Sequence, residues 1–472
     1  MPLAHGPAML FFAPGAASDK PPFGGLHITD ERSMSGTDEG DGRHAPDRRR
    51  FLRGMAGAAS LAAAAVTVRR AAADPSDQPA NPLDALMGDR AHDEFGQSFD
   101  EASRTLHMPK ATVPTLSPQT AETTQQAIAT YDDIVAKGGW PLVPKVDDLH
   151  LGMRHPSVVD LRRRLAVSGD LDPNAVGNDI YDSYVEAAVR RFQARHGLTT
   201  DGVVRQATLL AMNISAEMRR DQLKVNIARL KTLTTNLGPR YVVVNLPAAR
   251  VEAIEHDVAV SRYTAVVGRP SRPSPEINSK IVEINFNPFW TVPVSIVRKD
   301  LIPIMEKDPE YLSKNHIRIY DVHHNELPAS QINWYSEDAV HYTFRQDPGD
   351  FNSLGRIRIN FPSPYGVYMH DTDERELFGG DYRWDSSGCC RIQNVRELVY
   401  WLLDETKGWP PEAIDQAIQS GDQDNARLAK PVPLHWVYVT GWCGSDGIVQ
   451  FREDIYGRDG LGEPVMPQTE PL

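Results

Sequence analysis

Residues 369–372 read Met-His-Asp-Thr, and residues 386–391 read Ser-Ser-Gly-Cys-Cys-Arg. These two motifs place His370 and Cys389 nineteen residues apart in the chain. A cysteine attacks a carbonyl carbon as the thiolate, and a nearby imidazole can accept the proton of the thiol. An isolated histidine or cysteine is more often a buried structural residue, so the surrounding residues decide between the two interpretations.

The residues directly before the thiol favour catalysis. Ser387 and Gly388 are small enough to allow backbone N–H groups to converge beside Cys389, as an oxyanion hole requires. The same turn can therefore supply the nucleophile and the group that stabilises the developing negative charge.

Longer stretches around both motifs resemble a known family. Val367-Tyr-Met-His-Asp-Thr372, Leu377-Phe378 and Ser386-Ser-Gly-Cys-x-Arg391 are similar to the signature of the L,D-transpeptidase catalytic domain family, which joins peptidoglycan stem peptides by cysteine chemistry. Many members have glycine and histidine where this chain has Asp371 and Ser387. The resemblance is to the large periplasmic subfamily, which carries a peptidoglycan-binding module ahead of the catalytic domain and an inserted capping subdomain.

This resemblance implies a two-step exchange that forms 3-3 cross-links between stem peptides. Cys389 would attack the carbonyl that precedes the terminal D-residue of a donor stem, and His370 would serve as base and then as acid. Hydrolysis of the same thioester would instead give an L,D-carboxypeptidase or endopeptidase, and a non-catalytic peptidoglycan-binding protein is the remaining alternative. The family also implies acylation of the cysteine by β-lactams of the carbapenem class.

Other residues near the motifs are candidates for the site. The imidazole can be oriented by the backbone carbonyl of Asp371 or by its carboxylate. Arg391 can hold a carboxylate of the substrate or brace the loop through an ion pair. Tyr368, Arg383 and Trp384 flank the motifs and are assigned to substrate binding.

The remaining cysteines carry no predicted chemistry. Cys390 is expected to be a small buried hydrophobic residue, because adjacent cysteines form only a strained disulfide. Cys443 is assigned no role. The chain has no His-Glu-x-x-His pattern, phosphate-binding glycine loop or Ser-x-x-Lys motif, so neither a metal nor a cofactor is predicted.

The length, hydrophobic content and net charge of the chain indicate which kinds of partner it can bind. With 472 residues and 41% hydrophobic content, the chain is long enough for two or three soluble domains. A formal net charge of -13 disfavours binding to nucleic acid. The expected partners are therefore the stem peptides and glycan of peptidoglycan.

The first 73 residues resemble an export signal of the twin-arginine type. Residues 47–53 read Asp-Arg-Arg-Arg-Phe-Leu-Arg, and an apolar, alanine-rich run from Gly54 to Val68 precedes Ala71-Ala-Ala73. The run is shorter than the ~20 apolar residues that cross a bilayer, which favours a cleaved signal over a membrane anchor. We expect a mature protein in the periplasm without a stable membrane span.

A helical module is expected ahead of the catalytic domain. Apolar residues recur at helical spacing, and His196-Gly-Leu-x-x-Asp-Gly202 with Ala188-Val-Arg-Arg-Phe-Gln193 resembles the three-helix peptidoglycan-binding module. Some such modules act only as spacers.

From Arg240 onward, short β-branched runs separated by Pro, Gly and Asn predict strands, and residues 395–403 predict a helix. The fold class is therefore α+β. A polar, helix-prone insertion is expected either to form a lid over the site or only to pack on the sheet. The expected segments are a signal region 1–73, a linker 74–119, a helical segment 120–147, a peptidoglycan-binding-like domain 148–214, a connecting helix 215–238, a catalytic domain 239–460 with its insertion at 298–345, and a tail 461–472.

Overall fold

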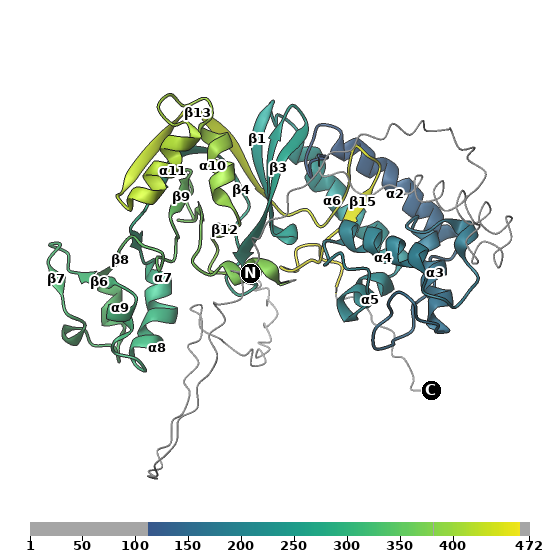
Figure 1. Cartoon of the computed structure of the whole chain (residues 1–472), viewed down its shortest axis with the longest axis horizontal. Helices are drawn as coiled ribbons and strands as arrows, with labels where there is room; N and C mark the ends of the chain where they lie inside the picture. Colours follow the sequence, from purple (N-terminus) through teal and green to yellow (C-terminus); the bar gives the residue numbers. More distant parts are fainter. Residues whose placement is uncertain (1–111, 381, 463–472) are drawn as a thin grey trace, which may run out of the picture. The chain divides into compact units, whose positions relative to one another are not determined.

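The computed structural model describes residues 112–380 and 382–462 (Figure 1). The predicted signal region, most of the predicted linker and residues 463–472 of the predicted tail lie outside the described residues. Within the described part, no helix is long and apolar enough to cross a membrane. The fold is α+β, as the sequence predicts.

A nine-stranded sheet dominates the C-terminal half, in the order β11-β3-β12-β10-β9-β4-β13-β1-β2. An additional pairing of β2 with β3 joins the two ends of this order, so the sheet closes on itself with β11 attached to β3. The strands are β1 Arg240–Asn245, β2 Arg250–Glu255, β3 Val258–Gly268, β4 Ile277–Phe286, β9 Ile357–Asn360, β10 Met369–His370, β11 Trp384–Ser386, β12 Cys390–Ile392 and β13 Asp424–Val437.

The sheet carries apolar side chains on both of its faces, so both faces are buried. Along β1, Val242 and Val244 join the main core, whereas Tyr241 and Val243 pack into a second cluster on the opposite face. The main core is covered by α10 (Val395–Leu403), as predicted, and by α11 (Pro411–Ser420). Strands buried on both faces read as continuous β-branched runs, and the sequence of β1 is such a run.

Three helices build the module that precedes the sheet. They are α3 Ser157–Val167, α4 Ser183–His196 and α5 Gln206–Asn213, with the 3-10 turn η1 Pro173–Ala175 between α3 and α4. The side chain of Asp182 caps α4 by accepting from the backbone N–H groups of Tyr184 and Val185, both at 3.1 Å. Gly197, with φ +70°, ends α4 in the left-handed conformation that glycine adopts without strain.

Two long helices connect this module to the sheet. Helix α2 (Thr120–Ala136) packs against α6 (Ala216–Leu233) and the hairpin of β14 (Gly441–Cys443) and β15 (Val449–Phe451). Gln222 of α6 donates from Nε2 to the backbone oxygen of Arg452 at 2.8 Å. Helix α6 is therefore hydrogen-bonded to the segment that follows β15.

The last residues of the predicted linker, 112–119, pack against the sheet. Leu116 is fully buried, and its carbonyl accepts a hydrogen bond from the hydroxyl of Tyr241 at 2.7 Å. The backbone N–H of Thr115 donates to Glu252 at 2.7 Å, and that of Ala259 donates to the carbonyl of Thr112 at 2.9 Å.

A separate subdomain with its own core is inserted between β4 and β9. The sequence favours helix here, but the structure contains a four-stranded sheet, β5-β8-β6-β7, beside very short helices. The strands are only two to four residues long, which is too short to show a clear period in the sequence. The elements are β5 Trp290–Thr291, α7 Val294–Ile296, the π-helical turn η3 Val297–Leu301, α8 Ile302–Met305, α9 Tyr311–Lys314, β6 Ile317–Tyr320, β7 Glu326–Leu327, η4 Ala329–Gln331, η5 Glu337–His341 and β8 Thr343–Gln346.

Leu116→Ala tests whether residues 112–119 are part of the folded unit. Removing this buried side chain is expected to lower the free energy of unfolding by about 2–5 kcal/mol, because a cavity remains in the core. Urea denaturation of both proteins measures the change. Leu142→Ala is the control, because Leu142 is 45% exposed, and a loss of similar size there would contradict the assignment.

Candidate active site

The pairing of β10 with β12 brings the two sequence motifs together. These strands run parallel, with Met369 opposite Cys390 and His370 opposite Arg391. Side chains alternate between the faces of a strand, so Arg391 and the thiol two residues earlier project to one face, together with His370. Met369 and Cys390 project to the other face and are fully buried in the main core.

Cys389 and His370 line one cavity of about 140 Å³. Arg391, Tyr368 and Ser387 also line it. The opposite wall comes from the inserted subdomain and the strands that lead into it, with Trp290, Pro293, Ser295, Ile296, Ser353 and Leu354. The remaining wall residues are Tyr365, Gly366, Val367, Asp373, Glu374 and Ser386.

A backbone carbonyl orients the imidazole. Nδ1 of His370 is hydrogen-bonded to the carbonyl oxygen of Asp371. A carbonyl can only accept, so Nδ1 carries the proton and Nε2 keeps its lone pair. His370 is therefore held in the tautomer that can accept a proton at Nε2.

The carboxylate of Asp371 has a different partner. Its Oδ2 accepts from the backbone N–H of Arg356 at 3.1 Å, in the turn that leads into β9. Gly355 in this turn has φ +58°, and a Cβ there would lie 2.6 Å from the same oxygen. Of the two orienting groups that the sequence leaves open, the structure shows the backbone carbonyl in contact with the imidazole.

Burial keeps both reacting groups neutral at rest. It lowers the pKa of His370 to about 3, with further lowering by the positive charges of Arg391 and Arg358. It also raises the pKa of the Cys389 thiol, against the opposing effects of a backbone hydrogen bond at Tyr368 and the same two arginines. The resting site therefore holds a thiol and a neutral imidazole rather than a thiolate–imidazolium pair.

Arg358 is a site residue that the sequence analysis misses. It lies on β9 directly opposite His370, and its guanidinium stacks over the ring of Tyr368 at 4.2 Å from the centroid. Its position next to the imidazole depends on the register of β9 with β10, which a single sequence does not show. The alternation Ile357-Arg358-Ile359 does indicate that Arg358 faces away from the core.

The loop before the thiol is fixed by internal hydrogen bonds. Gly388 has φ +115°, a conformation that favours glycine, and its N–H donates to Oγ of Ser386 at 3.1 Å. Oγ of Ser386 in turn donates to the carbonyl of Cys389 at 2.7 Å. The N–H of Gly388 is therefore already engaged, and among the described residues none accepts a hydrogen bond from the N–H of Ser387 or Cys389. These two N–H groups are available as hydrogen-bond donors beside the thiol.

Ser387 connects the loop to the inserted subdomain. Its Oγ accepts from Nη1 of Arg272 at 3.0 Å, and the same guanidinium bonds both carboxylate oxygens of Asp300, one of them at 2.9 Å. Asp300 lies in the π-helical turn η3 of the subdomain. Arg272 and Asp300 are further residues that the sequence motifs do not reveal.

Arg391 is engaged in an ion pair with Glu374, and both side chains are largely buried. The sequence leaves open whether Arg391 holds a substrate carboxylate or braces the loop through an ion pair. The contact with Glu374 is an ion pair of the second kind. The pair also lines the cavity, so the guanidinium lies beside the reacting groups while its charge is balanced.

Two of the predicted substrate-binding residues lie elsewhere. Trp384 is buried in the main core, and its Nε1 donates to the carbonyl of Leu246 at 3.0 Å. Arg383 lines a different cavity. Proximity in sequence to the motif is misleading here, because β11 pairs with β3 and not with β10 or β12. Tyr368, by contrast, lines the cavity as predicted, with its ring 5.7 Å from that of His370.

The thiol of Cys389 does not lie at the N-terminus of a helix. The strand β12 separates Cys389 from α10, which begins only at Val395. Burial dominates, and the pKa of the thiol is raised rather than lowered. Cys390 is fully buried, and burial likewise raises the pKa of its thiol.

Comparisons with known protein families identify two domains in this chain. Residues 239–413 match the family model described as "L,D-transpeptidase catalytic domain", and residues 154–212 match the one described as "Putative peptidoglycan binding domain". The chain therefore contains an L,D-transpeptidase catalytic domain, preceded by a domain of the peptidoglycan-binding type. The resemblance seen in the sequence motifs is confirmed.

One curated relative and two solved structures give the range of similarity. A protein of Haemophilus influenzae named "Putative L,D-transpeptidase" is 32% identical over 219 residues, which cover 46% of this chain and 44% of that protein. The chain thus spans less than half of the length of that relative. An L,D-transpeptidase structure from Xylanimonas cellulosilytica is 13% identical, with 62% of this chain and 99% of that chain covered and a TM-score of 0.20. One from Stackebrandtia nassauensis is 13% identical, with 63% and 96% covered and a TM-score of 0.22.

The raised pKa of Cys389 predicts how its alkylation depends on pH. Only the thiolate reacts, so the rate with iodoacetamide is expected to keep rising with pH through and beyond ~8.5, the ordinary thiol value. Mass spectrometry of the peptide that contains Cys389, prepared from the Cys390→Ala chain, measures this rate without a second thiol in the same peptide. A rate that is already constant between about pH 6 and 8 would indicate a resting thiolate and contradict the neutral site.

Proposed function

We propose that this chain is a peptidoglycan L,D-transpeptidase that forms 3-3 cross-links between stem peptides through a thioacyl-enzyme on Cys389. The observation that carries the proposal is the register of β10 with β12, which gives His370, Arg391 and the thiol one face and one cavity. The match to the catalytic-domain family and the preceding peptidoglycan-binding-type domain support the substrate class.

The first step transfers the acyl group of the donor stem to the enzyme. Nε2 of His370 accepts the proton of the thiol as Sγ of Cys389 attacks the carbonyl carbon before the terminal D-residue. The carbonyl oxygen takes the negative charge and accepts hydrogen bonds from the N–H groups of Ser387 and Cys389. The C–N bond then breaks, and the imidazolium gives its proton to the departing amine.

The second step returns the enzyme to its resting form. The side-chain amine of an acceptor stem attacks the thioester carbonyl while Nε2 of His370 takes one of its protons. The C–S bond breaks, and the thiolate regains the proton from the imidazolium. The product is an amide between the two stems, and Cys389 and His370 are again neutral.

The positions of Arg391 and Arg358 suit this cycle. During attack the site acquires a negative charge on the substrate oxygen and, transiently, on the thiolate. Both guanidinium groups favour a thiolate and disfavour a resting imidazolium, as their effects on the two pKa values show. They therefore stabilise charge that appears only when the thiol ionises for reaction.

Walls from the inserted subdomain support transfer over hydrolysis. Trp290, Pro293 and Ile296 close one side of the cavity with largely apolar surface. Such walls limit the access of water to a thioester, whereas an acceptor amine is delivered by its own binding. We propose that the subdomain acts as a cover of the site.

Cys389→Ala tests the mechanism. The full-length protein is incubated with disaccharide-tetrapeptide, and the masses of the products are measured by mass spectrometry. We expect a dimer that has lost one D-alanine from the unmodified chain and no product from the variant, because the nucleophile is absent. A carbapenem is likewise expected to add its mass only to the unmodified chain.

Cys390→Ala is the matched control, because this residue is adjacent but faces the core. It should retain turnover. A cysteine-dependent tripeptide monomer without dimer would instead assign hydrolysis, and product from Cys389→Ala would refute the thioacyl mechanism. Unchanged substrate with both proteins would favour a role in peptidoglycan binding.

Asp371→Gly tests which group orients the base. The backbone carbonyl that holds Nδ1 of His370 remains in this variant, so turnover is expected to stay within about threefold of the unmodified chain. His370→Ala should reduce turnover by about 100-fold or more, because the proton acceptor is lost. If Asp371→Gly were as inactive as His370→Ala, the carboxylate rather than the carbonyl would be required.

A further inference from the structure

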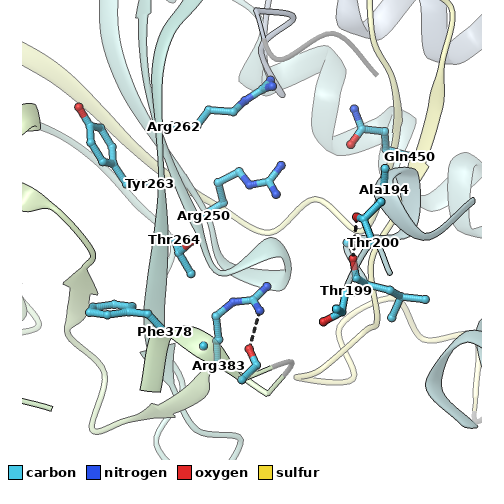
Figure 2. Close-up of a pocket in the computed structure, with 14 residues that line it drawn as sticks. Ala194, Thr199, Thr200, Arg250, Arg262, Tyr263, Thr264, Phe378, Arg383 and Gln450 are labelled. Carbon is cyan, nitrogen blue, oxygen red and sulfur yellow. Dashed lines mark hydrogen bonds between the residues drawn. The ribbon is translucent and has the colours of Figure 1, made fainter. Parts of the chain in front are cut away.

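A second cavity, of about 550 Å³, lies between the helical module and the sheet (Figure 2). One wall consists of Arg250, Arg262, Tyr263 and Thr264 on β2 and β3, with Arg383 beside them. The opposite wall comes from the end of α4 and the loop that follows, together with Gln450. The remaining lining residues are in and after the 3-10 turn η6 (Arg375–Gly379).

The cavity has an excess of positive charge. Arg250, Arg262 and Arg383 all line it, and Figure 2 shows their side chains directed toward the wall that carries Thr199, Thr200 and Gln450. Arg452 packs against Gly197 of that wall, and its pKa is lowered by burial and further by repulsion from Arg250, Arg383 and Arg262.

One carboxylate partly balances this charge. Glu252 bonds Arg262 at 2.8 Å, and it also accepts from the backbone N–H of Thr115. Arg383 donates to the carbonyl oxygen of Gly380 at 2.8 Å, which is neutral.

Arg250 is the residue that most clearly needs an external partner. Its guanidinium makes no hydrogen bond or ion pair with any of the described residues, although the residue is half-buried. Burial lowers its pKa, and repulsion by Arg262 and Arg383 adds to this effect against the attraction of Glu252. A partly buried charge without a counter-ion is unfavourable, so the arrangement costs stability unless an anion binds.

The wall formed by the end of α4 and the following loop is held in place by contacts with residues 451 and 452. It also carries groups that can form hydrogen bonds with a ligand. Nη1 of Arg452 donates to the carbonyl oxygen of Arg195, in the last turn of α4, at 2.9 Å. The ring of His196 stacks on that of Phe451 at 5.7 Å between centroids. Thr199 and Thr200 follow directly in the chain, so their hydroxyl and backbone groups face the arginines across the cavity (Figure 2).

We propose that this cavity is a second peptidoglycan site, which binds a carboxylate of a stem peptide through Arg250. The assignment rests on the proposed function for the class of ligand. Guanidinium groups bind carboxylates bidentately, and a volume of 550 Å³ lies in the range of roughly 300–1,000 Å³ typical of sites for drug-sized ligands. Leu198 adds apolar surface that a peptide can contact and that inorganic phosphate cannot use.

Binding is tested in the full-length Cys389→Ala chain, which cannot turn over a donor stem. The probe is a stem tetrapeptide with a photoreactive group, and both its Kd and its cross-linking to residues 194–200 are measured. Arg250→Met is expected to weaken binding and reduce this cross-link by about tenfold or more, because the unpaired guanidinium is lost. Arg250→Lys should be intermediate, and a peptide with amidated carboxylates should not cross-link there.

Thermal unfolding separates a binding role from a structural one. Without ligand, Arg250→Met is expected to raise Tm, because it removes repulsion from Arg262 and Arg383. The increase in Tm that the peptide produces in the parent chain should be lost. Arg163→Met is the control, because Arg163 is 60% exposed on α3, outside the cavity, and this variant should bind the peptide normally.

Three results would overturn the proposal. A lower Tm for Arg250→Met would show that Arg250 serves the fold, and unchanged cross-linking in that variant would place the peptide elsewhere. Binding of inorganic phosphate or pyrophosphate, but not of the peptide, in an Arg250-dependent manner would assign a phosphate site instead. Turnover by the unmodified chain is measured separately, so a failed transpeptidase assay would be distinguished from failure of this site.

Discussion

The parallel pairing of β10 with β12 is the constraint on which the site depends. Because side chains alternate along a strand, this register decides that the thiol of Cys389, and not that of Cys390, shares a face with His370. A shift of one residue would exchange the two thiols between the cavity and the core. The register is supported from both sides, since β10 also pairs with β9 and β12 also pairs with β3. The chemistry is therefore specified by backbone hydrogen bonds in the middle of a closed sheet.

Each of the two cavities contains a partly buried arginine, and the two arginines differ in how their charge is balanced. In the active-site cavity, Arg391 has a carboxylate partner in Glu374, and the charges of Arg391 and Arg358 lower the pKa of the Cys389 thiol against the effect of burial. In the second cavity, Arg250 has no such partner among the residues that the structure describes. The first charge is balanced by this ion pair, and for the second we propose that an anionic ligand supplies the balance.

Local patterns in the sequence predicted what depends on local structure. The helix 395–403 follows from the apolar spacing of Leu398 and Leu402, and the pairing of a histidine motif with a cysteine motif identified the candidate site. Long-range features were missed. The strand β13 begins at Asp424, but charged residues and two prolines interrupt its apolar pattern, and its register shifts between Arg427 and Val432. Contacts such as that of Arg358 with the ring of Tyr368 depend on strand register, which no single segment encodes.

The placement of the two adjacent cysteines also bears on oxidative damage. A thiolate that reacts with peroxide becomes a sulfenic acid, which is rescued when a second thiol reaches it and forms a disulfide. Cys390 points into the core on the opposite face of the sheet, and Cys443 is buried in a different cluster beside α2 and α6. All three cysteines of the chain are free, and in this structure neither Cys390 nor Cys443 faces Cys389 as a resolving thiol. A protonated thiol reacts slowly with peroxide, so the burial that raises the pKa of the Cys389 thiol also limits its oxidation.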